Sequence, residues 1–378
     1  MNYKNLSIVF GIVAIVFIGV SVYAIATYPV QQAPPAPLTI NGAGATFPAP
    51  LYQEMAAVYY NLTGVKINYQ GVGSGTGVND FNASVVDFAA SDPPLTASQY
   101  AYFVAHGYQP LQIPMTIGGI TFAYNVPGIT GHLNFTGNVL AAIFQGNITY
   151  WDDANITSLN PAVTLPHQAI VVCHRSDSSG STKITSTFLH DYGAGQYGGW
   201  KIGVANIVSW GSGTLGGTGN PGVAALIGHN QYSIGYVELQ YALGSNLTYG
   251  NVRNPAGNFV TPSLASLTAT IQTTGSNLPA NGSADFSGVH LYLGYYLTPS
   301  NAGQCYPVTS FSYIIVCQNL KAKLSDMTLA KAMALRAFLL WAVNLNQGQT
   351  YGPALSYVPL PANVVALDDA TIGSIYYA

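Results

Sequence analysis

The chain has 378 residues, a formal net charge of −3 and only 6% charged residues, beside 49% hydrophobic residues. Average soluble domains carry about 25% charged residues, so hydroxyl, amide and Tyr side chains must cover most of this surface. Ten cations against thirteen anions form no basic stripe, which excludes nucleic-acid binding.

Residues 1–28 predict a membrane segment. The run from Leu6 to Ala26 is almost continuously apolar, and Lys4 is the only charge in this part of the chain. The run is long enough for a span of ~20 residues and exceeds the ~7–15-residue core of a cleavable signal. We therefore favour a retained anchor with Lys4 inside the cell; the alternative is cleavage after Ala26 and secretion. Residues 29–37, rich in Pro, then predict a stiff linker.

Four predicted strands each stop at a turn rich in Ser, Thr and Gly, and three of these turns lead directly into a predicted helix. The strands and turns are Leu38–Ile40 with Asn41–Pro50, Val65–Gln70 with Gly71–Gly77, Val85–Ala90 with Ser91–Pro94, and Ala169–Val172 with Cys173–Thr182. In an open α/β sheet such turns gather at the carboxyl ends of the strands, where ligands bind. The pattern therefore predicts an α/β fold with one composite binding site.

The fourth turn holds Arg175, one of three arginines in the chain. An Arg at a strand end, followed by a Ser/Gly turn and a helix start, is suited to a small oxyanion. The first N–H groups of a helix lack intrahelical partners, its dipole favours negative charge, and Arg adds a forked donor. The alternative is a capped helix with a solvated Arg.

Other motifs indicate no cofactor and no metal. Gly211–Gly216 matches a dinucleotide fingerprint, but Gly217–Pro221 delays the predicted helix until Gly222–Ile227. The chain has no Gly-x-Ser-x-Gly elbow, and its Cys and His residues lack metal-ligand spacing. A later helix, Thr328–Val343, is predicted to pack in the core.

In an exported chain, Cys305 and Cys317 predict a disulfide that closes a short loop, the alternative being two buried thiols. Cys173 is left over and is expected to stay free. Seven Asn-x-Ser/Thr sequons fit an exposed, glycosylated, extracellular protein. They begin at Asn61, Asn82, Asn134, Asn147, Asn155, Asn246 and Asn281.

Several motifs in a fixed order carry a resemblance to one family. They are Asn41–Pro50, Tyr69–Gly75, Asp87–Asp92, Ile117–Gly119, Tyr150–Asp153, Arg175–Ser181, Ile234–Glu238, Phe338–Ala342 and Tyr357–Pro361. In these motifs the chain resembles the periplasmic-type phosphate-binding proteins that serve phosphate ABC transporters. The resemblance runs from about residue 38 to about residue 365, with a poorly matched stretch near 250–304.

The resemblance implies a phosphate site made of Thr46, Phe47, Ser74, Asp92, Arg175, Asp177, Ser179, Gly180 and Ser181. Asp92 would accept a proton from the ligand, Arg175 would pair with phosphate while Asp177 holds it, and the others would donate hydroxyl or N–H groups. Ser178 stands where the family commonly has Gly, and Ser181 where it commonly has Thr. Both keep the backbone donors, and Ser181 keeps its hydroxyl.

The implied architecture is a type II periplasmic-binding-protein-like α/β fold of two lobes joined by a hinge. We expect residues 38–122 plus 238–378 in the first lobe and 123–237 in the second, with crossings at Ile120–Tyr124 and Ser233–Val237.

The predicted function is capture of inorganic phosphate at the outer face of the membrane, by a monomer that delivers it to an ABC permease. The alternatives are a surface phosphatase or other phosphoryl-transfer enzyme, and a structural surface protein that keeps the fold. For the first alternative we find no nucleophile, base or metal in a suitable context.

Overall fold

The computed structural model of the protein describes residues 37–195 and 197–378. The predicted membrane segment and the linker up to residue 36 lie outside the described residues. In the part of the chain that is described, no helix is both long and apolar enough to cross a membrane.

The first lobe is built on five strands in the order β2-β1-β3-β12-β4. Their bounds are β1 Thr39–Gly44, β2 Lys66–Gly71, β3 Phe88–Ser91, β4 Pro110–Asn125 and β12 Thr309–Cys317. β1 pairs in parallel with β2 and β3, whereas β12 lies antiparallel between β3 and β4. The insertion of β12, from near the end of the chain, brings distant residues beside the turns that follow β1 and β3.

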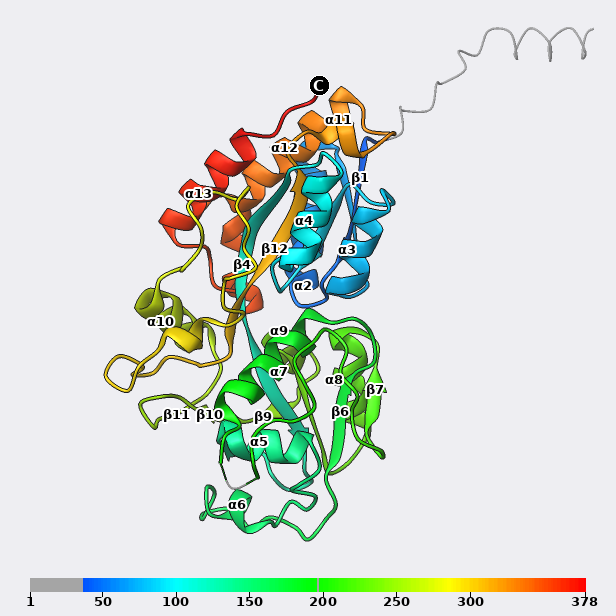
Figure 1. The fold of residues 1–378 in the computed structure, drawn as a ribbon. Coiled ribbons are helices and arrows are strands. Elements are labelled where there is room, and N and C mark those ends of the chain that lie inside the picture. Colours follow the sequence, from blue (N-terminus) through cyan, green and yellow to red (C-terminus); the bar gives the residue numbers. More distant parts are fainter. Residues whose placement is uncertain (1–36, 196) are drawn as a thin grey trace, which may run out of the picture. The chain divides into compact units, whose positions relative to one another are not determined.

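Six helices and two 3-10 turns accompany this sheet (Figure 1). They are α2 Ala49–Thr63, α3 Ser74–Asn82, α4 Ala97–Ala105, α11 Leu320–Lys323, α12 Leu329–Val343, α13 Ala362–Gly373, η2 Gly348–Tyr351 and η3 Pro353–Leu355. The predicted helix at 328–343 is confirmed as α12, for which the Thr328 side chain accepts the capping hydrogen bond from the Lys331 N–H.

The second lobe continues the same sheet through β8, β6 and β7. Its elements are α5 Gly137–Phe144, α6 Ala154–Thr157, β6 Val171–Arg175, α7 Gly180–Tyr192, β7 Leu215–Gly217, α8 Gly219–His229, β8 Ser233–Glu238, α9 Leu239–Gly244 and β9 Thr248–Tyr249. β6 pairs in parallel with both β7 and β8. α8 begins at Gly219, three residues before the predicted helix start at Gly222, and Thr218 is its N-cap residue.

The long strand β4 belongs to both lobes (Figure 1). Residues 110–119 pair with β12, and residues 120–125 pair with β8. The predicted two-lobed α/β arrangement is thus confirmed, and the first passage between lobes lies within a single strand. Gly118 and Gly119 stand at the change of partner, where a Cβ would meet the Phe47 ring at 2.8 Å and the Leu267 side chain at 2.6 Å.

The exact bounds of the lobes stay a prediction. The segment near 250–304 holds β10 Asn251–Arg253, β11 Phe259–Val260, α10 Leu264–Thr274 and η1 Leu293–Tyr296. β9 pairs with β4 at 123–124, and β10 pairs with β5, Asn134–Phe135. Because these partners belong to the second lobe, we propose that the chain returns to the first lobe after β11 and not at 233–237.

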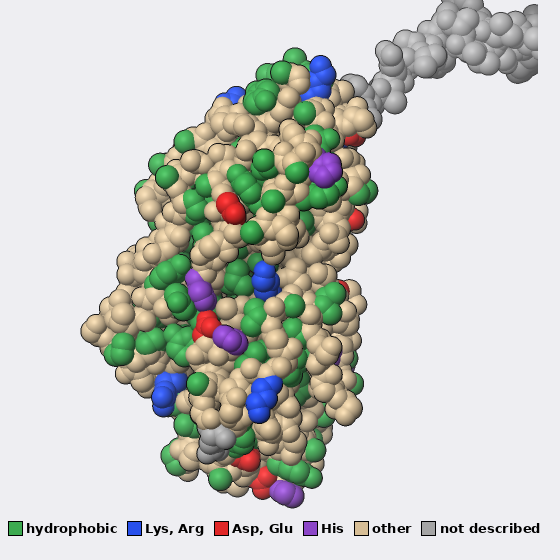
Figure 2. All heavy atoms as spheres, in the orientation of Figure 1, with side chains coloured by type: hydrophobic (Ala, Val, Ile, Leu, Met, Phe, Trp, Pro, Cys, Tyr) green, Lys and Arg blue, Asp and Glu red, His purple; other side chains and the backbone are tan. Residues whose placement is uncertain are grey.

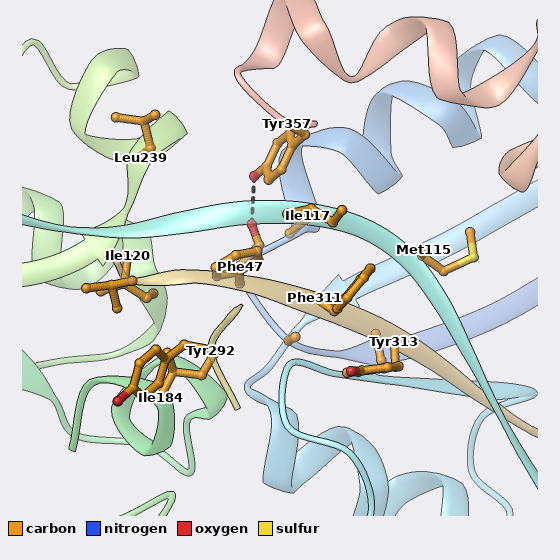
Figure 3. Close-up of a cluster of buried hydrophobic side chains, with 14 of the residues drawn as sticks. Phe47, Met115, Ile117, Ile120, Ile184, Leu239, Tyr292, Phe311, Tyr313 and Tyr357 are labelled. Carbon is orange, nitrogen blue, oxygen red and sulfur yellow. Dashed lines mark hydrogen bonds between the residues drawn. The ribbon is translucent and has the colours of Figure 1, made fainter. Parts of the chain in front are cut away.

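Buried aromatic and aliphatic side chains pack along β4 and β12, around Phe47 in the turn before α2 (Figure 3). Phe47 is fully buried there, and its carbonyl oxygen accepts a 2.6 Å hydrogen bond from the Tyr357 hydroxyl. This contact fixes the turn between β1 and α2 against the C-terminal part of the chain, 310 residues away.

The predicted disulfide is wrong, because Cys173, Cys305 and Cys317 are all free and buried. Cys305 contacts the Thr273 hydroxyl of α10 at one end of β12, whereas Cys317 packs with Val78 and Phe81 at the other end. The nine-residue strand between them spans about 26 Å, and a disulfide needs Cα atoms within about 7 Å. The short sequence spacing suggested a loop, but the intervening residues form an extended strand.

Candidate functional site

The ends of β1, β2, β3 and β6, with the turns and helix starts that follow them, meet where the two lobes face each other, and they carry all nine residues predicted for the site. A hydrogen bond between the lobes joins the site residues of the first lobe to those of the second. Arg175 of the second lobe donates to Thr46 of the first, at 3.0 Å between Nη1 and Oγ1. The first-lobe turns therefore lie against the start of α7.

Arg175 ends β6 with a buried side chain, 1% exposed. Its Nε donates to Asp177 Oδ1 at 2.7 Å, and Nη2 donates to the other carboxylate oxygen. Burial raises the pKa of Asp177, but the hydrogen bonds and charge of Arg175 outweigh it, so the pKa is lowered overall. The two-pronged pair keeps Asp177 ionised and fixes the plane of the guanidinium.

Asp92 follows β3 and is 2% exposed. Its Oδ1 accepts a 2.9 Å hydrogen bond from the Ser312 hydroxyl, and its Oδ2 lies 3.4 Å from the Ser74 hydroxyl. Burial raises its pKa to about 7, although the Ser312 hydrogen bond, the charge of Arg175 and the Ser74 hydrogen bond each lower it. Near neutral pH this carboxyl group can thus either accept or hold a proton.

The N-terminus of α7 closes the site from the second lobe. Ser179 is its N-cap, and the Ser179 hydroxyl accepts from the Thr182 N–H at 3.1 Å. At Gly180 a Cβ would lie 2.4 Å from Ser74 Oγ and 2.6 Å from Asp92 Oδ2. Only glycine therefore lets α7 approach so closely, and its first turn has N–H groups without intrahelical partners.

Asn220 of α8 is a residue that the sequence analysis missed. It is fully buried, and both its backbone N–H and its Nδ2 donate to Thr46 Oγ1, at 3.1 and 2.9 Å. Nδ2 also lies 3.3 Å from Ser181 Oγ, and the Glu238 N–H donates to Asn220 Oδ1 at 3.0 Å. Because both hydroxyl oxygens already accept hydrogen bonds, their protons remain for donation to a ligand.

Ser312 and Tyr236 were also missed. Ser312 holds Asp92 from β12, and the Tyr236 hydroxyl accepts from the Arg175 N–H at 3.1 Å and lies 2.7 Å from Thr182 Oγ1. The one available signal was that Tyr236 lies in the family-like motif 234–238. No sequence signal indicated Ser312, because its strand contains neither a turn nor a charged residue.

The site combines the Arg175 cation, its paired carboxylate Asp177, the titratable carboxyl group of Asp92 and several neutral donors. Arg175 and Asp177 cancel in formal charge, so an anion would be bound mainly by oriented hydroxyl and N–H dipoles. Among the described residues there is no cluster of three His, Cys, Asp or Glu side chains that could hold a metal ion. The arrangement is suited to a small oxyanion that has at least one proton to donate to Asp92.

Comparison with known proteins gives consistent results. The family described as the PBP superfamily domain matches residues 29–344. The phosphate-binding protein PstS of Pasteurella multocida is 39% identical over 330 residues, which cover 86% of this chain and 88% of that protein. The phosphate-binding protein PstS of Methanocaldococcus jannaschii is 33% identical over 349 residues, covering 90% and 87%.

Solved structures share the fold. A high-affinity periplasmic phosphate-binding protein with bound phosphate has a TM-score of 0.69 at 23% identity, covering 88% of this chain and 93% of that one. A phosphate-binding protein from Stenotrophomonas maltophilia has a TM-score of 0.63 at 18% identity, covering 89% and 93%. At such identities these neighbours establish the fold alone.

Proposed function

This chain belongs to the family of PstS phosphate-binding proteins within the PBP superfamily, and on that premise we propose that it captures inorganic phosphate outside the cell and delivers it to a phosphate ABC permease. The relatives are named as binding proteins, and this chain is likewise a binding protein and not an enzyme.

The observation that carries the proposal is the buried Arg175, held by Asp177 on its own lobe and in contact with Thr46 on the other. A tetrahedral anion between the lobes would receive donors from both. Ligand binding and lobe closure would then be coupled, because neither lobe alone completes the set of donors.

We assign the donors as follows. The hydroxyl groups of Thr46 and Ser181 keep their protons for the anion because their oxygens act as acceptors, from Asn220 in both cases and also from Arg175 at Thr46. The same holds for Ser179, whose oxygen accepts from the Thr182 N–H. Ser74, the Phe47 N–H and the first turn of α7 add further donors, and Arg175 adds the charge.

Asp92 would supply selectivity. Phosphate carries one or two protons at neutral pH, whereas sulfate carries none. With Ser312 on Oδ1, the other oxygen of Asp92 can accept the proton of phosphate, but it would meet sulfate as an unpaired, repelled acceptor. Sites of this kind reject the analogue by about 10⁴–10⁵-fold.

The cellular setting follows from the family and the N-terminal sequence. We propose a monomer at the outer face of the membrane, anchored by residues 1–28 or secreted after cleavage at Ala26. Four sequons offer exposed Asn side chains for glycosylation: Asn61, Asn147, Asn246 and Asn281.

Titration of ligand-stripped protein with phosphate tests this function. We expect one tight site per chain, weak or no binding of sulfate, and no release of phosphate from a phosphate monoester. Absence of phosphate binding by correctly folded protein would favour the structural alternative. Phosphate release that is lost in Arg175→Ala would instead support the phosphatase.

A further inference from the structure

A cavity of about 530 Å³ lies between the lobes, directly beside the proposed phosphate site. Its lining includes Ser74, Ser91 and Gln99 from the first lobe and Ser178, Lys183 and Asn206 from the second. The cavity reaches the surface at Ile207, a lining side chain that is 64% exposed. Ser74 lines the cavity and also contacts Asp92 of the inner site, so the cavity and the inner site are adjacent.

Lys183 is the only charged residue among the described residues that line this cavity. It lies on α7, three residues after Gly180, and is half-buried. Within the described part of the chain, Lys183 forms no ion pair, whereas Lys331 contacts both Asp87 and Asp326. Burial lowers the pKa of Lys183, and no neighbouring carboxylate offsets this effect. An anion in the cavity would supply the missing counter-charge.

The rest of the surface gives an incoming anion little attraction. The chain carries ten cations and thirteen anions, and Figure 2 shows charged side chains few and scattered on the face in view. A cation that lines a cavity beside the inner site therefore has more influence on phosphate association here than it would in a highly charged protein, because few other charges compete with it.

We propose that this cavity is a second, transient oxyanion site, in which Lys183 receives phosphate at the mouth of the cleft and passes it to the inner site. The proposal rests on the proposed function. The described residues that line the mouth site include no carboxylate, so it takes phosphate and sulfate alike, and discrimination occurs afterwards at Asp92. Lys183 therefore sets the association rate, while the inner residues set the dissociation rate and selectivity.

Stopped-flow measurement of phosphate association, with the fluorescence of the tryptophans as the signal, tests the proposal. Lys183→Met should lower the association rate constant about three- to tenfold, flatten its dependence on ionic strength and leave the dissociation rate within twofold. Lys183→Arg should keep the parental rate. The matched control is Lys201→Met, because Lys201 is exposed on the same lobe but does not line the cavity; it should associate like the parent.

Sulfate gives a second, independent measurement. At constant ionic strength, replacing chloride with sulfate should slow phosphate association in the parent and much less in Lys183→Met. An unchanged association rate in Lys183→Met, an equal fall in Lys201→Met, or an effect confined to dissociation would overturn the inference. Failure of the parent to bind phosphate at all would instead refute the proposed function, so the two failures are distinguishable.

Discussion

Replacing Arg175 with Ala should weaken phosphate binding by at least tenfold. The side chain is 1% exposed and makes three hydrogen bonds, two to Asp177 and one to Thr46. A charge-assisted hydrogen bond contributes about 1.5–3 kcal/mol, which corresponds to roughly 10- to 150-fold in affinity.

The loss should lie toward the upper end of that range. Without Arg175, the Asp177 carboxylate keeps two backbone donors, the Gly219 N–H at 3.1 Å and its own N–H, but no counter-charge, and its charge then repels the anion. Adding Asp177→Asn to Arg175→Ala removes this repulsion, so the double variant should bind phosphate more tightly than the single one. Arg175→Lys should fall between parent and Ala, because an ammonium group cannot reproduce the fork to Asp177.

Isothermal titration of ligand-stripped proteins measures these affinities. Arg253→Ala is the matched control, since Arg253 is exposed on β10 and contacts none of the site residues; its affinity should equal that of the parent. A folded Arg175→Ala protein whose phosphate affinity is within threefold of the parental value would show that Arg175 does not bind phosphate as proposed. If the double variant binds phosphate more weakly than Arg175→Ala, the unpaired Asp177 carboxylate does not repel the anion.

Four further predictions concern selectivity, stability and thiols. Asp92→Asn should have a lower ratio of phosphate affinity to sulfate affinity than the parent. An unchanged ratio would show that Asp92 does not discriminate between the two anions. Burial raises the pKa of Asp92 from 3.8 to about 7. The protonated carboxyl group therefore stabilises the ligand-free fold below pH about 4, and this stability is lost as the pH rises to about 7. The gain in Tm from Asp92→Asn should accordingly be larger at pH 8 than at pH 4. Lys331→Met leaves the buried Asp87 without its 2.8 Å ion pair and should lower the free energy of unfolding by about 3 kcal/mol in urea titrations, whereas a change below 0.5 kcal/mol would argue against the pair. Mass spectrometry should find Cys305 and Cys317 unlinked and alkylated only after unfolding, and a linked peptide in a non-reduced digest would contradict the structure.

The sequence alone was sufficient for the local parts of the site. Strand ends, helix starts and the residues between them depend on turn chemistry within about ten positions, so the turns around Thr46, Ser74, Asp92 and Arg175 could be recognised one by one. The alternation of strands and helices likewise predicted an α/β fold, because each element has its own hydrophobic period.

The tertiary structure decided which distant residues complete the site. Asn220 reaches Thr46 across 174 residues, and Ser312 reaches Asp92 across 220. Neither residue has a local signal, since its role arises only when α8 and β12 are placed beside the turns. The same long-range order made β12 a strand and so separated Cys305 from Cys317. Local propensity sets which elements form, but strand order and the meeting of the lobes, which depend on burial over the whole chain, set which side chains come together.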